Sequence, residues 1–361
     1  MPVNNIISDG VFSTTKSHAQ KGKLLNKANL ENLSEAKGLN DLVTRLKATV
    51  YDEAVSRIKD PISAHKVEMA ANEHLADVHF NLMRISPHHE VLHSYYLRYI
   101  TSNLKTVLKG KALGRSFESI QGYIGLYAEE LIGRRDLVTR VLASENLEEA
   151  VGLLERSDFY EDIRDAVVTY KENGRLDVFD VYLDKAFYSK LSQVYAKHYG
   201  GKYLTFGRSS DKIYPLIAAD IDSHNAISIL RAKSWGLPVA SIRSLIIEPT
   251  FDIPVKLLYH MSGAEDMIEA SKFLERTPYR KIFPSSVPEG EIIASLEDSF
   301  RTLAFERAYH PFLWNVDSEA LPLGLIRLKE LEIRNIAAIA FGVGQGMSGK
   351  EISSKINMPK R

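Results

Sequence analysis

Apolar residues recur every three to four positions over long stretches of this chain, which is the spacing of amphipathic helices. The clearest stretches are residues 18–55 and 328–352, and turn-rich segments containing proline and glycine lie between the apolar ones. The pattern therefore predicts an all-α protein. Residues 1 to about 16 are polar, and we expect them to form an irregular leader.

The last helical stretch has a skeleton that occurs twice earlier in the chain. An asparagine, a glycine and an isoleucine keep the same spacing in three places: Asn103, Gly114 and Ile120; Asn225, Gly236 and Ile242; Asn335, Gly346 and Ile352. Each glycine is predicted to end a helix in the left-handed C′ conformation, which a residue without a Cβ adopts freely. Shortly after each glycine stands a residue that favours a helix start, namely Ser116, Pro238 or Ser348.

A second repeated element is a hydroxyl residue followed at a fixed spacing by an aromatic one, each time after a leucine. The three copies are Leu46, Thr49 and Tyr51; Leu154, Ser157 and Phe159; Leu274, Thr277 and Tyr279. We expect the hydroxyl group to cap a new helix where the previous one ends, and the aromatic ring to lie in the core. A weaker third element is an acidic residue before a phenylalanine, at Asp77 and Phe80, Asp184 and Phe187, and Glu297 and Phe300.

The three elements always follow one another in the same order, with nearly constant offsets between copies. Loop insertions within a repeated unit produce this kind of variation. The sequence therefore predicts three similar helical lobes, over residues 1–125 (with the leader), 126–245 and 246–361. The asparagines of the repeat could bond backbone groups in the lobe core or lie at an interface, and the core interpretation is favoured.

Composition narrows the classes of function. The chain has 361 residues, more than one hydrophobic core usually serves, and its 46 basic residues balance 46 acidic ones, which disfavours nucleic-acid binding. It has no cysteine, so disulfides and thiol nucleophiles are excluded. The chain contains neither a signal segment nor an apolar run long enough to span a bilayer, so we expect any membrane association to come through a partner.

Two motifs resemble enzyme sites. His89-Glu90-Val91-Leu92-His93 has the H-E-x-x-H pattern of zinc hydrolases, but Pro87 would place His89 in the first turn of its helix. The segment from Gly344 to Lys350 has the outline of a P-loop, but Glu351 stands where Mg²⁺ needs a hydroxyl ligand. We therefore expect no catalytic residue, metal or cofactor, and a zinc hydrolase using His89, Glu90 and His93 stays an alternative.

Four segments resemble the C subunit of archaeal-type (A/V-type) rotary ATPases, which is the counterpart of the d subunit in eukaryotic V-ATPases. They are residues 23–55, FDVYLDKAFYSKL at 179–191, DIDSHNAISILRAKSWGL at 220–237, and LKELEIRNIAAIAFGVGQGMSGKEI at 328–352. The last two resemble the most specific family segments. The chain departs from the family in having Lys16, His18 and Lys21 where arginines are expected, and Phe341 and Val343 where the second lobe has basic residues.

The resemblance implies a non-catalytic rotor subunit made of three helical lobes in a pseudo-threefold funnel. It further implies a cytoplasmic, peripheral position on the inner face of the membrane, between the central-stalk subunits (D and F type) and the proteolipid ring, in proton or sodium transport coupled to ATP. Polar contacts to these partners are expected from charged residues on the asparagine-bearing helices, namely Arg231, Lys233, Glu332 and Arg334. A generic helical scaffold protein is the other alternative.

Overall fold

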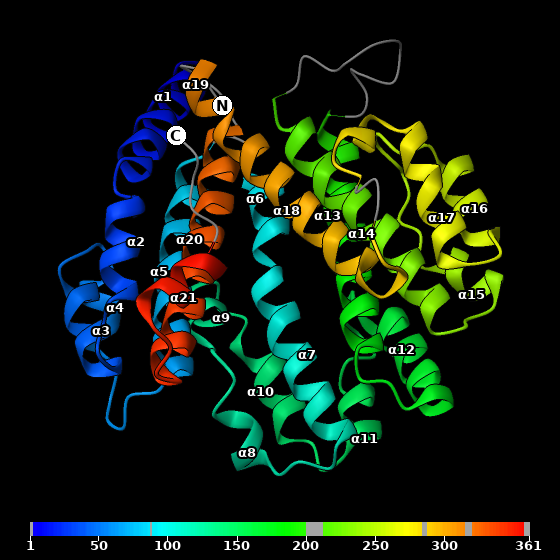
Figure 1. The fold of residues 1–361 in the computed structure, drawn as a ribbon, viewed down its shortest axis with the longest axis horizontal. Coiled ribbons are helices and arrows are strands. Elements are labelled where there is room, and N and C mark those ends of the chain that lie inside the picture. The colour runs from blue at the N-terminus through cyan, green and yellow to red at the C-terminus, as the bar shows by residue number, and fades with distance from the viewer. Residues whose placement is uncertain (1–2, 87–88, 200–211, 284–286, 315–319, 357–361) are drawn as a thin grey trace. The chain divides into compact units, whose positions relative to one another are not determined.

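The computed structural model describes residues 3–86, 89–199, 212–283, 287–314 and 320–356 (Figure 1). Every regular element among these residues is a helix, which confirms the predicted all-α class. The chain divides into two compact units, each built from segments that are distant in the sequence. The division into lobes at residues 125 and 245 and their threefold arrangement stay predictions.

Unit 1 comprises Met1–His89, Gly125–Arg134 and Ala308–Arg361. Its helices are α1 (Val3–Lys21), α2 (Lys27–Ser34), α3 (Leu39–Lys47), α4 (Asp52–Ser56), α5 (Ala64–Ile85), α9 (Tyr127–Leu131), α19 (Pro311–Trp314), α20 (Ala320–Gly344) and α21 (Gly349–Lys355).

Unit 2 comprises Glu90–Ile124 and Arg135–Arg307. Its helices are α6 (His89–Tyr96), α7 (Arg98–Ala112), α8 (Phe117–Gln121), α10 (Arg135–Ala143), α11 (Leu147–Gly152), α12 (Tyr160–Asn173), α13 (Val178–Tyr199), α14 (Tyr214–Ser234), α15 (Val239–Ser244), α16 (Val255–Gly263), α17 (Met267–Lys272), η2 (Phe273–Arg276), η3 (Pro278–Lys281), η4 (Glu289–Glu291) and α18 (Ile292–Tyr309).

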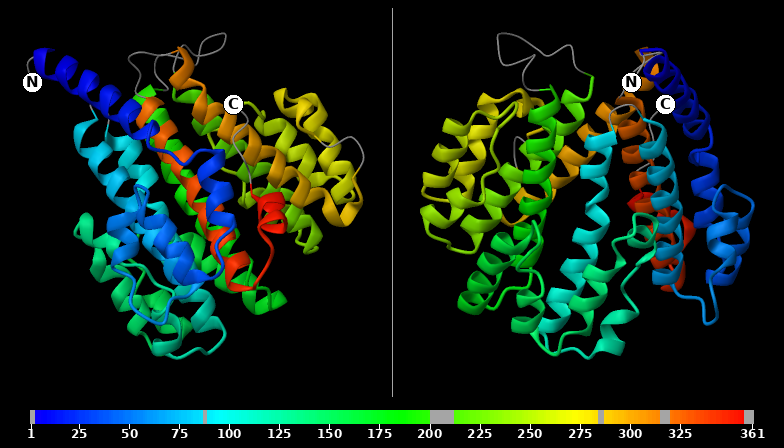
Figure 2. Two further views of the ribbon diagram at one scale, coloured as in Figure 1. Left: turned by 60° about the vertical axis from the view of Figure 1, so that its left-hand side comes forward. Right: turned by 180° about the vertical axis from the view of Figure 1, so that it is seen from behind.

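Helix α20 is the centre of unit 1. Its sequence is rich in leucine, isoleucine and alanine on nearly all sides, which suits a helix surrounded by protein. It packs along α5, and α1 runs beside it in the views of Figure 2. The prediction of an irregular leader is wrong from Val3 onward, because α1 is a helix. It buries small hydroxyl residues, among them Ser13 and Ser17, in place of the apolar residues by which an amphipathic helix is recognised in a sequence.

The helix ends predicted from the repeat share one geometry. Gly114, Gly236 and Gly346 all have φ between 64° and 72°, the left-handed conformation expected of a C′ residue. In each copy the glycine N–H and the following N–H bond back to carbonyls of the last turn, which is the Schellman arrangement. Helices α8, α15 and α21 then start at the N-cap residues Ser116, Pro238 and Ser348.

The hydroxyl junctions are also alike. Each hydroxyl oxygen donates to the carbonyl of the leucine before it and accepts from the amide of the aromatic residue after it; the hydroxyl–carbonyl distances at Thr49, Ser157 and Thr277 are 2.6, 2.7 and 2.6 Å. The side chains of Tyr51, Phe159 and Tyr279 are buried. Local chain geometry is therefore repeated three times. The prediction that the hydroxyl caps a new helix is correct only for Thr277, the N-cap of η3, and wrong for Thr49 and Ser157, because α4 and α12 begin only after Tyr51 and Phe159.

Each long asparagine-bearing helix packs against the short helices that precede the hydroxyl residue of the following copy, rather than those of its own copy. Helix α7 packs on α10 and α11, and α14 packs on α16 and α17. Helix α20, the last of the three, packs on α2 and α3 from the beginning of the chain. Within unit 1, the last copy of the asparagine-bearing helix therefore contacts helices of the first copy.

Candidate partner-binding surface and buried carboxylates

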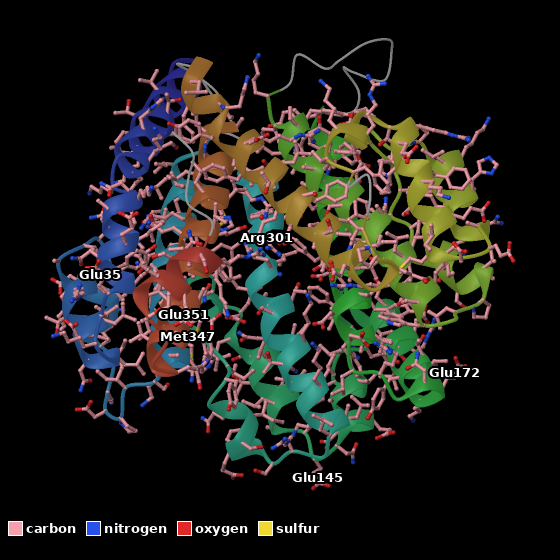
Figure 3. All side chains as sticks on the ribbon, viewed as in Figure 1. Glu35, Glu145, Glu172, Arg301, Met347 and Glu351 are labelled. Carbon is pink, nitrogen blue, oxygen red and sulfur yellow. The ribbon has the colours of Figure 1, made fainter. Side chains whose placement is uncertain are left out.

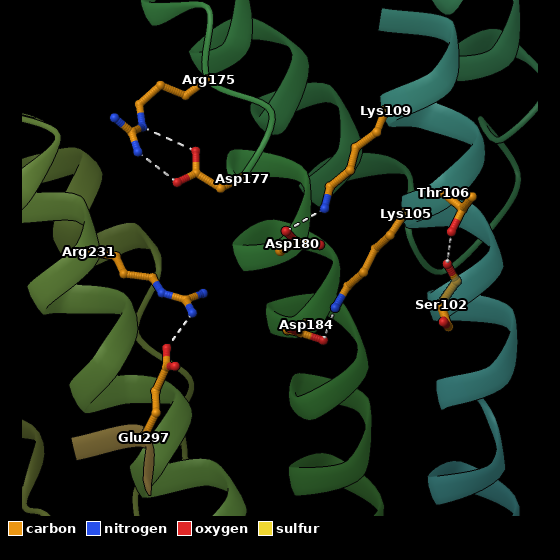
Figure 4. Close-up of polar contacts among 10 residues, drawn as sticks. All are labelled: Ser102, Lys105, Thr106, Lys109, Arg175, Asp177, Asp180, Asp184, Arg231 and Glu297. Atoms are coloured by element: carbon orange, nitrogen blue, oxygen red, sulfur yellow. Dashed lines mark hydrogen bonds and ion pairs between the residues drawn. The ribbon is translucent and has the colours of Figure 1, made fainter. Parts of the chain in front are cut away.

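The face of α7 toward α13 carries two lysines one helical turn apart. The ammonium group of Lys105 lies 2.5 Å from Asp184, and Lys109 pairs with Asp180, so two ion pairs link the antiparallel helices (Figure 4). All four side chains are partly exposed, with 19–33% of their surface accessible. Ion pairs at such exposure contribute little to stability and can be exchanged for other partners at low cost.

Two of the residues predicted to contact partners lie on α14 in unit 2. Arg231 pairs with Glu297 of α18, and the two side chains are 33% and 30% exposed (Figure 4). Lys233 donates to the carbonyl of Ala264, and partial burial lowers the pKa of its ammonium group. Both cations are therefore engaged inside the unit but remain open to solvent on one side.

The other two predicted residues lie on α20 in unit 1 and differ in environment. Arg334 is exposed. Glu332 is only 6% exposed, and its carboxylate accepts hydrogen bonds from the amide of Leu25 and the hydroxyl of Tyr51. A carboxylate that is buried and bonded in this way belongs to the core, so Glu332 is not carried forward as a partner contact.

The charge of Glu332 is matched by a fully buried lysine. The ammonium nitrogen of Lys329 lies 3.2 Å from Glu332 Oε1 and 5.1 Å from the ring centroid of Tyr51. The ring of His74 packs against Tyr51 at 4.8 Å, and burial, with the nearby charges of Lys329 and Lys23, lowers the pKa of His74 to about 4. This interior therefore holds an ion pair and a neutral imidazole.

A related arrangement occurs on α14. Asp222, which stands three positions before Asn225 as Glu332 does before Asn335, accepts from the hydroxyl of Tyr279 at 2.7 Å and from the amide of Asp252 at 2.8 Å. Burial raises the pKa of Asp222 to about 7, and the nearby negative charge of Asp252 acts in the same direction. Asp222 and Glu332 thus bind a repeat tyrosine and a loop amide in the same way.

The remaining copy of this arrangement has neither the acid nor the tyrosine. Ile100 stands three positions before Asn103, and Phe159 replaces the tyrosine. Sequence reasoning selected Glu332 only as a partner contact and missed its equivalence to Asp222, because the acid is present in two copies out of three. The matched loss of acid and hydroxyl was the signal that could have found it.

The asparagines of the repeat are all buried. Asn225 donates from its side-chain amide to the carbonyl of Ile247 at 3.1 Å and accepts from the amide of the same residue at 2.8 Å. It therefore ties α14 to the segment after α15. Sequence reasoning could not identify this backbone partner, because it depends on tertiary packing.

The two enzyme-like motifs have structural explanations. Helix α6 begins at His89, as the proline before it predicts. The side chain of His89 lies outside the described part of the structure, and among the side chains that are described no group of three histidine, aspartate or glutamate residues could hold a metal ion. Near the chain end, Gly344 is the last residue of α20, and Ser348 forms a capping box with Glu351, which is labelled in Figure 3. The glycines of the P-loop-like segment are therefore explained by their positions at helix ends.

Comparison with known proteins defines the class. The chain matches the ATP synthase (C/AC39) subunit family over residues 13–355 and belongs to that family, as the sequence resemblance predicts. The family is a non-catalytic subunit of rotary ATPases, and this assignment gives no support to the zinc hydrolase alternative.

Individual relatives are similar to this chain over most of their length. The C subunit of the A-type ATP synthase of Methanocaldococcus jannaschii is 24% identical over 365 residues, covering 95% of this chain and 85% of the relative. Those of Thermococcus kodakarensis and Pyrococcus horikoshii are 24% and 25% identical, covering 94% and 91% of this chain and 88% and 85% of theirs. In the part of the chain that the structure describes, no helix is long and apolar enough to cross a membrane.

Proposed function

We propose that this protein is the socket of a rotary ATPase rotor, holding the central stalk and resting on the membrane proteolipid ring. The observation that carries the proposal is the family match over nearly the whole chain. In this proposal the three copies of the junction form three lobes of a pseudo-threefold funnel, on the cytoplasmic side of the membrane. The partners are the D- and F-type stalk subunits and the ring, and the transported ion is a proton or sodium.

A socket that transmits torque has to resist deformation. Helices packed at protein density supply that resistance, and bonds between distant parts of the sequence add to it. In unit 1 the carboxylate of Glu332 joins α20 to the N-terminal segment through Leu25 and Tyr51. Such a buried connection supports a mechanical role because breaking it would leave a buried carboxylate without its donors, which resists separation of α20 from the N-terminal segment.

A socket that can release its stalk needs contacts that exchange easily. Arg231, Lys233 and Arg334 are the charged residues that we assign to the stalk. The ion pair between Arg231 and Glu297 is one-third exposed, so a partner carboxylate can replace Glu297 at little cost in free energy. We place these three cations, rather than the buried Glu332, in the contact.

The general proposal is tested by capture from membranes. A tagged copy of the chain, purified from detergent-solubilised membranes of its own host, should bring down the stalk subunits and the proteolipid ring. Capture of neither would overturn the rotor proposal and leave the generic scaffold. Capture of the stalk without the ring would support the socket and contradict the ring contact.

The assignment of residues is tested separately with the isolated stalk subunits. Arg231→Glu and Arg334→Glu should each weaken stalk binding about tenfold or more, because each places an anion where a cation is proposed to act. Lys171→Glu is the matched control, since Lys171 is 58% exposed on α12 and pairs with Glu148. Affinity within twofold of the unaltered protein for Arg231→Glu and Arg334→Glu would remove those residues from the interface.

A further inference from the structure

Two carboxylates fasten loops to long helices in the same way, and we call each arrangement a clasp. In the first clasp Glu332 of α20 accepts from the hydroxyl of Tyr51 and the amide of Leu25. In the second clasp Asp222 of α14 accepts from the hydroxyl of Tyr279 and the amide of Asp252.

The two clasps differ in how their charge is balanced. Glu332 has the buried ammonium group of Lys329 at 3.2 Å. Asp222 instead faces a second carboxylate, because the hydroxyl of Tyr279 lies between Asp222 at 2.7 Å and Asp252 at 3.3 Å. Asp222 is fully buried, whereas Asp252 is 23% exposed and pairs with Arg307. Both burial and the neighbouring negative charge favour the protonated form of Asp222.

The remaining groups around Asp222 do not supply a direct counter-charge. The titratable and charged groups that face it are Asp252 from the loop before α16, Tyr279 from η3, Arg307 from α18 and Tyr214 from the start of α14. The guanidinium of Arg307 is directed to Asp252, at 3.5 Å, and to the carbonyl of Pro215. Oxygen Oδ1 of Asp222 is buried and has no hydrogen-bond partner within the described part of the chain.

We propose that Asp222 is a proton-operated lock: when protonated it holds the loop around Asp252 on α14, and loss of its proton loosens that loop. The Glu332 clasp, which has Lys329 beside its carboxylate, serves as the comparison. The proposal does not rest on the rotor function, since it concerns one unit of the chain by itself.

The direction in which pH changes the opening of the loop follows from proton linkage. Burial raises the pKa of Asp222 to about 7 in the closed state. When the loop opens, water reaches the carboxyl and its pKa returns toward about 4. Between these values the open state loses the proton while the closed state keeps it, so opening becomes easier as pH rises from about 4 to about 7 and levels off above that.

Hydrogen exchange measured by mass spectrometry tests this directly on the full chain. A peptide containing Asp252 reports the second clasp, and one containing Leu25 reports the first clasp in the same sample. After correction for the intrinsic exchange rate, the opening equilibrium of the Asp252 peptide should rise on the order of tenfold or more between pH 5.5 and 7.5. The Leu25 peptide should show no comparable rise.

Asp222→Asn is the diagnostic variant, because an amide keeps the size and the accepting oxygen but cannot titrate. It should make the Asp252 peptide independent of pH within about twofold, whereas Glu332→Gln should leave the pH response of that peptide intact. An unchanged pH response in Asp222→Asn, or none in the unaltered protein, would overturn the proposal.

Infrared spectroscopy gives a second readout that does not depend on a variant that folds well. The unaltered protein should lose a protonated-carboxyl carbonyl band as pH rises through 7, and Tyr279→Phe should move that loss to higher pH because it removes a donor to the charged form. A spectrum without such a band near pH 6 contradicts the lock, whatever the outcome of stalk binding.

Discussion

The hydroxyl of Tyr51 lies 2.5 Å from the carboxylate of Glu332, although 281 residues separate the two in the chain. The bond therefore connects the first helices of unit 1 to its last long helix. The same relationship joins Tyr279 to Asp222 in unit 2, and the third copy has Phe159 and Ile100 at the corresponding positions. Hydroxyl and acid are either both present or both absent.

Tyr51→Phe should lower the free energy of unfolding by about 1–3 kcal/mol, because it takes a donor away from a buried carboxylate. Urea denaturation followed by circular dichroism measures the change. Phe159→Tyr is the reverse substitution in the copy that has no acid, and we expect no stabilisation from it. A loss below about 0.5 kcal/mol for Tyr51→Phe would show that the bond contributes little.

Lys329→Met should be more damaging, by about 3–5 kcal/mol, because it leaves the charge of Glu332 buried without its cation. The double variant Lys329→Met/Glu332→Gln should recover part of this loss, since both charges are then absent. Lys109→Met provides the comparison for a half-exposed ion pair and should cost about 1 kcal/mol or less. Equal losses for Lys329→Met and Lys109→Met would contradict the assigned difference in burial.

Acid should destabilise the fold through two buried histidines. Burial lowers the pKa of His224 to about 3 and that of His74 to about 4, with nearby lysines and, for His224, Arg231 adding to the effect. The unfolded chain binds their protons below about pH 6.5, so the free energy of unfolding falls as pH drops, by about 2 kcal/mol per histidine at pH 5.

His224→Gln tests this prediction by denaturation at pH 7.5 and pH 5. The variant should lose less stability between the two values than the unaltered protein does. Asp222 acts in the opposite direction over roughly pH 4 to 7, so the comparison has to be made between variants rather than read from one pH profile. An identical loss in both proteins would mean that His224 does not carry this dependence.

Glycines of α20 give a matched pair for packing. A Cβ at Gly324 would lie 2.7 Å from the backbone oxygen of Ala308, whereas at Gly344 the nearest atom is 3.8 Å away. Gly324→Ala should therefore destabilise by about 1–3 kcal/mol. Gly344→Ala should be neutral or gain up to about 1 kcal/mol, because alanine favours helix. Thermal unfolding distinguishes the two, and similar midpoints would contradict this account.

The sequence was sufficient for the local features of the repeat. A glycine at a helix end and a hydroxyl at a helix start act within a few residues of themselves, so their spacing predicts Gly346 and Ser348 correctly. The sequence was not sufficient to place Glu332 in the core, because the burial of its carboxylate depends on contacts with Tyr51 and Lys329. The pattern of charges alone predicts an exposed side chain. Helix α1 was missed because hydroxyl residues such as Ser17 replace its apolar stripe.

The packing of α2 and α3 on α20 has a consequence for synthesis of the chain. Ribosomes make α2 and α3 well before α20, because about 280 residues separate these elements in the sequence. Unit 2 lies wholly within residues 90–307 and can be completed earlier. Helices α2 and α3 therefore stay without this contact until α20 has been made, whereas the contacts inside unit 2 form between segments that are closer in the sequence.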